Sequence, residues 1–353
     1  MTLIEQILVN AVQEVEVMYN IMICDDSAFM RKIFSDTVNN DPQLRAQITA
    51  HNGKDALKKL EREDIDLLML DVEMPKMNGL ETLEAVKDKY PELPVIMVSA
   101  LDNRETVFKA LDLGAFDFIP KPSGSISLNI DSIKEELIRK IKAALGAKKV
   151  SKQRSRKKYS LKSKDKFPIV AVGSSSGGPK ALTEVFSAIP DDFPAAFVIV
   201  QHMPPGFTET LAQRLDRVSG LSIKEAEKGD QLKAGTGLLA PGDYHLEIDS
   251  RAKVKLNQKD RKHGVRPCVD YMMQSLAKYF DGDRLLGVVL TGMGHDGAEG
   301  MDQIVSAGGY GIIESKETAL VYGMPSSVAK LGAYHEIKKI DEIGKRIIDI
   351  VEG

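Results

Sequence analysis

Short apolar runs alternate with amphipathic stretches over the first part of the chain. Strand-like runs rich in Val, Ile, Leu and Met occur at 20–24, 47–50, 67–70, 95–98 and 116–119. Apolar residues recur at helical spacing over 28–38, 53–62, 79–89 and 104–113, and again from about residue 131. Because short buried strands that alternate with helices form parallel sheets, this pattern predicts a doubly wound, five-stranded parallel sheet.

A second α/β pattern begins at Phe167, and no internal repeat relates it to the first. Its strand-like runs lie at 169–172, 196–200, 236–240 and 285–290. We therefore expect a second doubly wound α/β domain with a mostly parallel sheet. The predicted boundaries are an extension at 1–17, a first domain at 18–141, a linker at 142–166 and a second domain at 167–353. The extension is either a short amphipathic helix or sequence upstream of a start at Met18.

Composition agrees with two domains and excludes several classes of protein. The 353 residues are 43% hydrophobic and 28% charged, so each half can bury a core. Cys24 and Cys268 are too few for a disulfide framework or a cysteine-cluster metal site. No apolar run reaches transmembrane length, and the N-terminus lacks the basic start of a signal peptide. The sequence predicts a cytoplasmic protein without direct membrane insertion.

The net charge of −3 hides a basic segment. Residues 148–166 hold ten basic side chains and one acid. Such a run can bind nucleic acid, but it contains only one aromatic residue, Tyr159, and has no helical or strand period. The pattern favours a solvated, flexible linker and no nucleic-acid partner.

Polar side chains gather at the ends of the strands predicted for the first domain. Asp25 and Asp26 follow the first strand, Asp71 the third, Ser99 the fourth and Lys121 the fifth. Carboxyl ends of parallel strands meet at one crevice, so these groups should converge. Clustered carboxylates suit Mg²⁺, and one of them can then act as a nucleophile that forms an acyl phosphate.

These residues, with Asp71-Val-Glu-Met-Pro75, Gly79, Ser99-Ala100 and Lys121-Pro122, resemble a two-component receiver domain over its whole length. The resemblance implies that Asp71 is the phosphoacceptor and that Ser99, Phe118 and Lys121 form the switch. It also implies an Mg²⁺ site formed by Asp25, Asp26, Asp71 and Glu73. The Lys121–Pro122 bond matches one that is often cis in such domains.

The most informative segment of the second domain surrounds Ser175. An apolar strand runs into Gly173-x-Ser175-x-Gly177, and a helical pattern begins after Pro179. This is the spacing of a nucleophile elbow, in which a tight turn exposes a serine hydroxyl and supplies backbone N–H donors to an oxyanion. The same run also suits a loop that cradles phosphate at a helix N-terminus.

A serine nucleophile needs a base and an orienting carboxylate. His202 follows the strand at 196–200, and Asp296 lies in the glycine-rich loop after the strand at 285–290. We expect Asp296 to accept the Nδ1–H of His202, which leaves Nε2 to take the serine proton. His245 and His263 lie in charged, irregular sequence and are predicted at the surface. Gly292-x-Gly294-x-x-Gly297 also matches a dinucleotide fingerprint, although it lies late in the chain.

The order serine, histidine, aspartate differs from that of α/β-hydrolases. The second domain, with this order and with the segments Gly173–Gly178, Gln201-His-Met-Pro204 and Leu290–Ala298, resembles the catalytic domain of chemotaxis protein-glutamate methylesterases. The resemblance implies Ser175 as nucleophile, His202 as base, Asp296 as orienter and the Met293 N–H as oxyanion donor. His295 stands where the family usually has Asn.

The resemblance predicts a phosphorylation-activated serine carboxylesterase. Its expected substrates are methylated glutamates on the cytoplasmic helices of chemoreceptors, with glutamine deamidation as a second activity. A chemotaxis histidine kinase is the expected phosphodonor, Mg²⁺ serves phosphorylation, and the esterase needs no cofactor. Because a flexible basic linker cannot itself transmit a signal, we expect the receiver to dock directly over Ser175. The expected docking surface lies near Ser99 and Phe118. The alternatives are a receiver-linked nucleic-acid regulator and a receiver fused to a nucleotide-binding module at Gly292.

Overall fold

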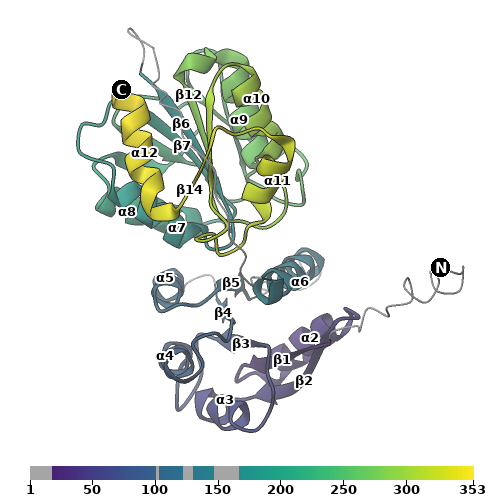
Figure 1. Cartoon of the computed structure of the whole chain (residues 1–353). Helices are drawn as coiled ribbons and strands as arrows, with labels where there is room; N and C mark the ends of the chain where they lie inside the picture. Colours follow the sequence, from purple (N-terminus) through teal and green to yellow (C-terminus); the bar gives the residue numbers. More distant parts are fainter. Residues whose placement is uncertain (1–17, 101–102, 122–129, 147–166) are drawn as a thin grey trace, which may run out of the picture.

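The computed structural model describes residues 18–100, 103–121, 130–146 and 167–353. Two α/β domains lie one above the other in Figure 1, with the C-terminal domain uppermost. The predictions for residues 1–17, for Pro122 and for 147–166 of the linker lie outside the described residues. No helix in the described part of the chain is long and apolar enough to cross a membrane.

The N-terminal domain is a five-stranded parallel sheet in the order β2-β1-β3-β4-β5, as predicted. Helices α2 and α6 contact one another, while α3, α4 and α5 follow one another in contact, so both faces are covered. The strands are β1 Tyr19–Cys24, β2 Leu44–Ala50, β3 Leu67–Asp71, β4 Val95–Ser99 and β5 Asp117–Pro120. The helices are α2 Ala28–Asn39, α3 Gly53–Leu60, α4 Gly79–Lys89, α5 Arg104–Asp112 and α6 Ile130–Gly146.

Helix α6 corrects one predicted boundary. It continues to Gly146, so residues 142–146, which were assigned to the linker, are helical. The physical reason is the apolar stripe of the helix, because Leu137, Ile141 and Ala144 recur at helical spacing and are all buried.

The C-terminal domain is built on a seven-stranded sheet in the order β14-β13-β12-β6-β7-β9-β8, with every pair parallel. Its strands are β6 Ile169–Ser174, β7 Ala196–Gln201, β8 Ser222–Glu225, β9 Thr236–Leu239, β12 Leu285–Val289, β13 Tyr310–Glu314 and β14 Glu336–Lys338. The helices are α7 Gly178–Ser187, α8 Phe207–Val218, α9 Val269–Tyr279, α10 Ala298–Ser306, α11 Gly323–Leu331 and α12 Ile340–Glu352, with a short 3₁₀ turn at Gly282–Arg284. An antiparallel hairpin, β10 His245–Ile248 and β11 Val254–Asn257, forms a separate two-stranded sheet.

The order of this sheet determines where a site can form. From the central strand β6 the chain moves one way to β7 and β9, and β12, on the other side of β6, leads to β13 and β14. The direction of winding therefore reverses between β6 and β12. Crevices beyond the carboxyl ends of strands at such a reversal are the usual ligand sites of open α/β sheets.

The two domains are in direct contact through α5, which packs against α7 and α8. The Arg214 guanidinium donates two hydrogen bonds to the Asp112 carboxylate, at 2.6 and 2.9 Å. The rings of Phe118 and Phe207 meet with their centroids 4.6 Å apart. Phe118 therefore lies at the domain contact, on the surface where the sequence predicted docking.

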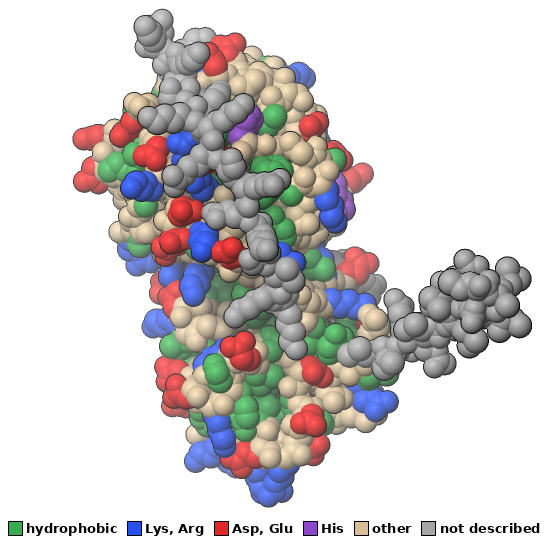
Figure 2. Space-filling view, in the orientation of Figure 1, with side chains coloured by type: hydrophobic (Ala, Val, Ile, Leu, Met, Phe, Trp, Pro, Cys, Tyr) green, Lys and Arg blue, Asp and Glu red, His purple; other side chains and the backbone are tan. Residues whose placement is uncertain are grey.

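Charged side chains of both signs are interspersed on the face shown in Figure 2. No patch of a single sign gathers on this face among the described residues. Duplex-binding proteins usually present a continuous basic surface. The described part of this face therefore gives no support to the nucleic-acid alternative.

Candidate active site

The carboxylates predicted at the crevice of the N-terminal domain do lie together. Asp25 and Asp71 are 1% exposed, and the Lys121 ammonium contacts both of them. Its Nζ lies 2.8 Å from Asp71 Oδ2 and 3.2 Å from Asp25 Oδ2. Three strand ends thus bring an ammonium and two acids to one point, as the parallel sheet requires.

Burial dominates the electrostatics of Asp71. It raises the pKa of this carboxyl to about 6, Asp25 adds to the effect, and the hydrogen bond and charge of Lys121 act against it. Burial acts to lower the pKa of Lys121, yet its contacts with Asp71 and Asp25 raise it overall. The crevice therefore holds a charged ammonium beside a carboxylate that is costly to ionise.

The crevice fits a hard divalent cation. Carboxylate oxygens of Asp25, Asp26 and Asp71 all lie within 4.8 Å of one another, and an all-oxygen donor set is the one Mg²⁺ prefers. Glu73 differs from its expected place in the ligand set. Its side chain is exposed and lies outside this group, while its backbone N–H donates to Asp71 Oδ1 at 3.4 Å.

The two remaining switch residues are buried in different ways. Ser99 is fully buried, and its hydroxyl donates to the Ala100 carbonyl at 3.0 Å. Phe118 is 2% exposed, with the Lys140 ammonium 5.0 Å from the centre of its ring. The Lys140 ammonium also donates to the Phe118 carbonyl at 2.6 Å.

Ser175 follows β6 on a tight turn, as predicted. Gly178 donates its N–H to the Ser175 carbonyl at 2.7 Å, and Gly177 has a φ of +80° in the left-handed region. A β-carbon at Gly177 would lie 2.8 Å from the β-carbon of Leu320, so only glycine fits. Ser175 as a whole residue is 7% exposed, with the loop after β12 packed against the turn. The accessibility of its hydroxyl stays a prediction.

The loop after β12 lies directly against this turn. Ser175 donates its N–H to the Thr291 carbonyl at 2.9 Å. A β-carbon on Gly292 would lie 2.8 Å from that of Ser175 and 2.2 Å from the Met324 sulfur. Close packing against Ser175 thus accounts for the first glycine of the supposed dinucleotide fingerprint.

His202 and Asp296 form the predicted pair, but through the other ring nitrogen. His202 Nε2 lies 2.8 Å from Asp296 Oδ2, whereas the sequence predicted that Nδ1 would make this bond. His202 Nδ1 is buried and has no hydrogen-bond partner among the described residues. The direction from which the imidazole reaches the carboxylate depends on the turn after β7, which spacing does not reveal. Nδ1 is therefore the nitrogen left for proton transfer.

Ser175 and His202 come from adjacent strands. Ser174 pairs with Gln201 in the sheet, and the His202 N–H donates to the Ser174 carbonyl at 3.2 Å. Among the described residues, no hydrogen bond joins the Ser175 hydroxyl to His202. Catalytic hydrogen bonds are often longer in a free enzyme than in its substrate complex.

Asp296 is held at the N-terminus of α9. It accepts the N–H of Val269 at 2.7 Å, the N–H of Asp270 at 2.9 Å and the Cys268 thiol at 3.1 Å. Burial acts to raise the pKa of Asp296, but the bond and charge of His202, with the helix N–H and thiol donors, lower it well below its usual range. Asp296 is thus ionised and oriented, as a partner of the base must be.

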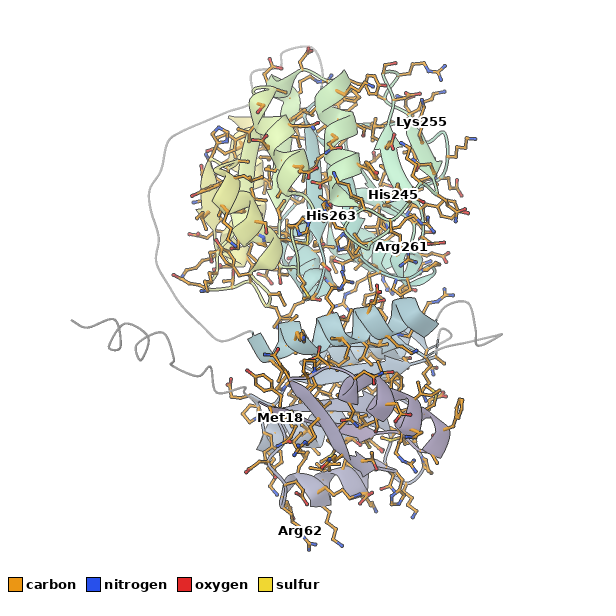
Figure 3. The ribbon with its side chains drawn as sticks, turned by 90° about the vertical axis from the view of Figure 1, so that its right-hand side faces the viewer. Met18, Arg62, His245, Lys255, Arg261 and His263 are labelled. Atoms are coloured by element: carbon orange, nitrogen blue, oxygen red, sulfur yellow. The ribbon has the colours of Figure 1, made fainter. Side chains whose placement is uncertain are left out.

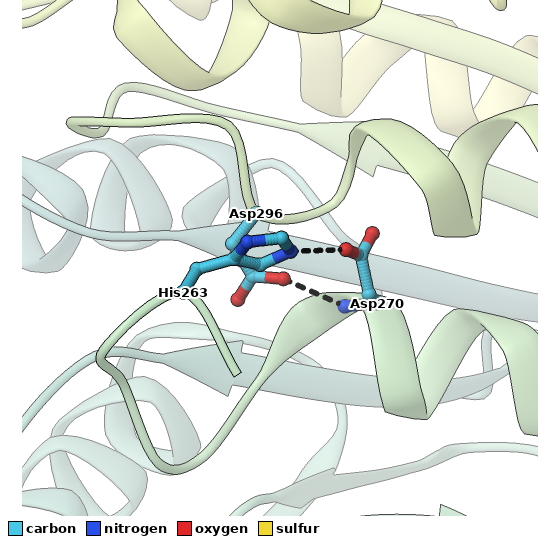
Figure 4. A group of neighbouring side chains, drawn as sticks. All are labelled: His263, Asp270 and Asp296. Carbon is cyan, nitrogen blue, oxygen red and sulfur yellow. Dashed lines mark hydrogen bonds and ion pairs between the residues drawn. The ribbon is translucent and has the colours of Figure 1, made fainter. Parts of the chain in front are cut away.

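A second histidine–aspartate pair, missed by the sequence reasoning, adjoins Asp296 (Figure 4). His263 Nε2 lies 2.7 Å from Asp270 Oδ2, and Asp270 also accepts the N–H groups of Gly297 and Gly300. The three side chains are close enough to hold a metal ion. However, backbone N–H groups already occupy the carboxylates, and the Lys262 ammonium lies 3.3 Å from Asp270. We interpret the cluster as a hydrogen-bonded support for Asp296.

The structure also places His245 and His263, which are labelled in Figure 3. His245, predicted at the surface, is fully buried, because the hairpin packs on α9 and its ring contacts Tyr271. His263 is largely buried as well. The ring centroids of His295 and His263 lie 4.2 Å apart, so His295 packs against His263. Among the described residues, no side-chain hydrogen bond joins His295 to Asp296. The start of a helical pattern at Cys268-Val-Asp270 marks the helix that carries Asp270, but the spacing does not signal its contact with His263.

A cleft of about 1050 Å³ lies between the two domains. Tyr19, Asp66 and Tyr90 line it from the N-terminal domain, and Gly177 and Thr291 line it from the C-terminal domain. Gly177 and Thr291 both adjoin Ser175, so the cleft reaches the edge of the nucleophile turn.

Met293 and Val321 of the catalytic domain pack against an apolar cluster of the receiver that includes residues of α6.

Comparison with known proteins agrees with both domains. The CheB methylesterase family model matches residues 170–347, and that of the response regulator receiver domain matches 21–130. The chain is 42% identical over 345 residues to the protein-glutamate methylesterase/protein-glutamine glutaminase of Pyrococcus horikoshii, covering 94% of this chain and 93% of that protein. The enzyme of that name from Symbiobacterium thermophilum is 42% identical over 347 residues, covering 93% and 95%.

A solved structure agrees in the catalytic half. The CheB methylesterase catalytic domain of Thermotoga maritima matches with a TM-score of 0.51 and 42% sequence identity, covering 53% of this chain and all of that one. The two family models together span the turn of Ser175, the loop of Asp296 and the receiver ahead of them. With those residues gathered at one crevice and relatives matched over nearly the whole length, this chain belongs to the CheB methylesterase family.

Proposed function

We propose that this protein hydrolyses glutamate methyl esters on chemoreceptors, releasing methanol, and that phosphorylation of its receiver domain raises the rate. The observation that carries the proposal is the His202–Asp296 pair beside the Ser175 turn, at the point where the sheet reverses its winding. Receptor glutamines are a second substrate, because an amide presents the same carbonyl. Such substrates place the enzyme in the cytoplasm, where a chemotaxis histidine kinase supplies the phosphoryl group.

The esterase reaction is acyl transfer from methoxide to serine and then to water. The Ser175 hydroxyl attacks the ester carbonyl while His202 Nδ1 takes its proton, and Asp296 holds the Nε2–H and stabilises the imidazolium. The Met293 N–H stabilises the oxyanion. His202 then donates the proton to the departing methoxide. It next takes a proton from the water that attacks the acyl-enzyme, which frees the glutamate and restores Ser175.

The receiver supplies the regulatory chemistry. Asp25, Asp26 and Asp71 would hold Mg²⁺, which offsets the charge of an incoming phosphodonor. Asp71 is the nucleophile that forms the acyl phosphate, and Lys121 is placed to contact the new phosphoryl oxygens. Ser99 and Phe118 then respond to the phosphoryl group.

The domain contact supports inhibition by docking. Phe118 and α5 lie against α7 and α8, the two helices that follow the strands bearing Ser175 and His202. A shift of Phe118 on phosphorylation would weaken this contact and favour an undocked state. Its effect is limited by the difference in affinity between the two receiver states.

Release of methanol from membranes with methylated receptors tests the proposal. The full chain should release methanol faster when a small phosphodonor and Mg²⁺ are present, and Ser175→Ala should release none. Methanol release by the Ser175→Ala chain would show that another residue is the nucleophile.

A further inference from the structure

Glu314 is a buried carboxylate that the reaction described above does not use. It ends β13, is 1% exposed and has no basic partner within ion-pair distance among the described residues. Its Oε2 accepts the Thr291 N–H at 2.7 Å, and its Oε1 accepts the Thr318 hydroxyl at 3.0 Å. Strand β13 lies next to β12, so Glu314 reaches the loop that carries Met293 and Asp296 at its start.

Thr291 joins that loop to the nucleophile turn. Its carbonyl accepts the Ser175 N–H at 2.9 Å, and its hydroxyl donates to the Ser176 carbonyl at 2.8 Å. The same hydroxyl oxygen accepts the Val321 N–H at 2.9 Å. The Thr291 N–H is the remaining hydrogen-bonding group of this residue, and Glu314 binds it. Any movement of Thr291 therefore moves the oxyanion loop relative to Ser175.

The placement of a lone carboxylate here is costly. Burial raises the pKa of Glu314 to about 7, although the bonds from Thr291 and Thr318 act to lower it. An apolar residue would avoid that cost, but it would leave the buried Thr291 N–H without an acceptor. What the position requires is an acceptor at the correct reach, whether or not it carries a charge.

We propose that Glu314 is a positioning residue for the esterase reaction: through Thr291 it fixes the loop that carries the Met293 N–H at its distance from Ser175. This inference rests on the proposed function, because it concerns the same nucleophile and oxyanion donor. Misplacement of such groups by about 1 Å costs on the order of 10²-fold in rate.

Three variants separate reach from charge. Glu314→Gln keeps an oxygen that can accept from Thr291, and its amide can donate to Thr318, whose hydroxyl oxygen is an acceptor. Glu314→Asp keeps the charge but withdraws the carboxylate by one methylene, and Glu314→Ala removes the acceptor. Glu336→Gln is the matched control, because Glu336 is a buried acid on the neighbouring strand β14 that binds Tyr310 and Arg346 instead.

The measurements are the kcat and KM of methanol release and the rate at which a fluorophosphonate labels Ser175, on full chains with phosphodonor and Mg²⁺. We expect kcat and the labelling rate to fall about 10- to 100-fold in the Asp and Ala variants, with KM little changed and with recovery in the Gln variant. Glu336→Gln should lower the melting temperature and leave kcat unchanged. If Glu314→Ala does not fold, the comparison of Glu314→Gln with Glu314→Asp still tests the proposal.

Equal labelling rates for the wild type and Glu314→Asp, both folded, would overturn the proposal, and so would a Gln variant as slow as Asp. Labelling requires no receptor. A wild type that labels quickly but releases no methanol would therefore contradict the proposed substrate and leave the comparison at Glu314 intact.

Discussion

The ring of Phe118 in the receiver packs against the ring of Phe207 in the catalytic domain, with 4.6 Å between their centroids. Both side chains are almost completely buried. Phe207 is the first residue of α8, and its neighbour Gly206 lies against the Arg104 side chain of α5. Phe118, which we expect to respond to phosphorylation, thus contacts the catalytic domain directly, with no helix or strand in between.

Breaking one polar contact of this interface should raise the basal esterase rate. Asp112→Ala removes the two hydrogen bonds to Arg214 without altering the catalytic domain. The pair is partly exposed, so its loss should weaken docking by at most about 1 kcal/mol and increase methanol release up to about fivefold. Glu61→Ala, which breaks an exposed pair with Lys89 inside the receiver, is the control. An unchanged basal rate in Asp112→Ala would mean that docking does not limit activity.

Removal of the receiver should have a larger effect. A fragment that begins near Phe167 should hydrolyse receptor methyl esters faster than the unphosphorylated full chain and should not respond to a phosphodonor. A solved relative consists of the catalytic domain alone, which supports independent folding of this half. Methanol release by the two forms, at equal concentration, is the measurement. A fragment as slow as the full chain would show that the receiver activates by another route, such as recruitment to the substrate.

The esterase residues should behave as a unit. Ser175→Ala and His202→Ala should each abolish methanol release, and the double variant should be scarcely slower than either single one. Asp296→Asn should cost about 10³–10⁴-fold, because the imidazole loses its oriented partner. His295→Asn serves as the control, since His295 contacts His263 instead of the triad carboxylate. Additive losses, or a His295 variant as slow as Asp296→Asn, would overturn the assignment.

Phosphorylation and esterase chemistry should be separable. Asp71→Asn should take up no label from a small radioactive phosphodonor and should keep the basal esterase rate, because Ser175 chemistry needs no phosphate. Asp26→Asn should also block labelling, since fewer charges remain to hold Mg²⁺. Asp88→Asn, on the exposed side of α4, should label normally. Label that persists in Asp71→Asn would place the phosphoacceptor elsewhere.

Glu314 should make the stability of the catalytic domain depend on pH. Its folded-state pKa of about 7 lies above the ordinary 4.5, so the folded state binds the proton more tightly than the unfolded chain. That contribution is complete below about pH 4.5 and is lost as the pH rises through 7. Between pH 5 and pH 8, the free energy of unfolding of Glu314→Gln should therefore increase relative to that of the wild type by on the order of 3 kcal/mol. Urea unfolding at both pH values measures it, and an equal difference at the two would contradict a raised pKa.

Hydrophobic periodicity predicted all five strands of the first sheet but missed three strands of the seven-stranded sheet. Strands such as β3, buried on both faces, are continuous apolar runs and were predicted almost to the residue. β8 and β14 are short edge strands that contain no apolar run, and they were missed. β13 was missed as well, although it is an interior strand that is buried along its whole length. α6 extended five residues further than expected, because its buried stripe continues past Ile141.

The candidate site was predictable where chemistry follows strand ends. Ser175, His202 and Asp296 each follow a strand, and the parallel sheet brings them to one edge. The choice of nitrogen on His202 was wrong, because it depends on side-chain direction after β7. The support from His263 and Asp270 comes from a loop and a helix start that are distant in sequence from Asp296. No periodicity signals such a contact.

The burial of Phe118 has a consequence for any other protein that recognises this receiver. The surface formed by α5 and Phe118 is occupied while the domains are docked, so a partner that uses the same surface competes with the catalytic domain. Binding free energies are reciprocal. Such a partner would release the esterase even without phosphate, and phosphorylation, by weakening docking, would make the receiver easier for that partner to bind.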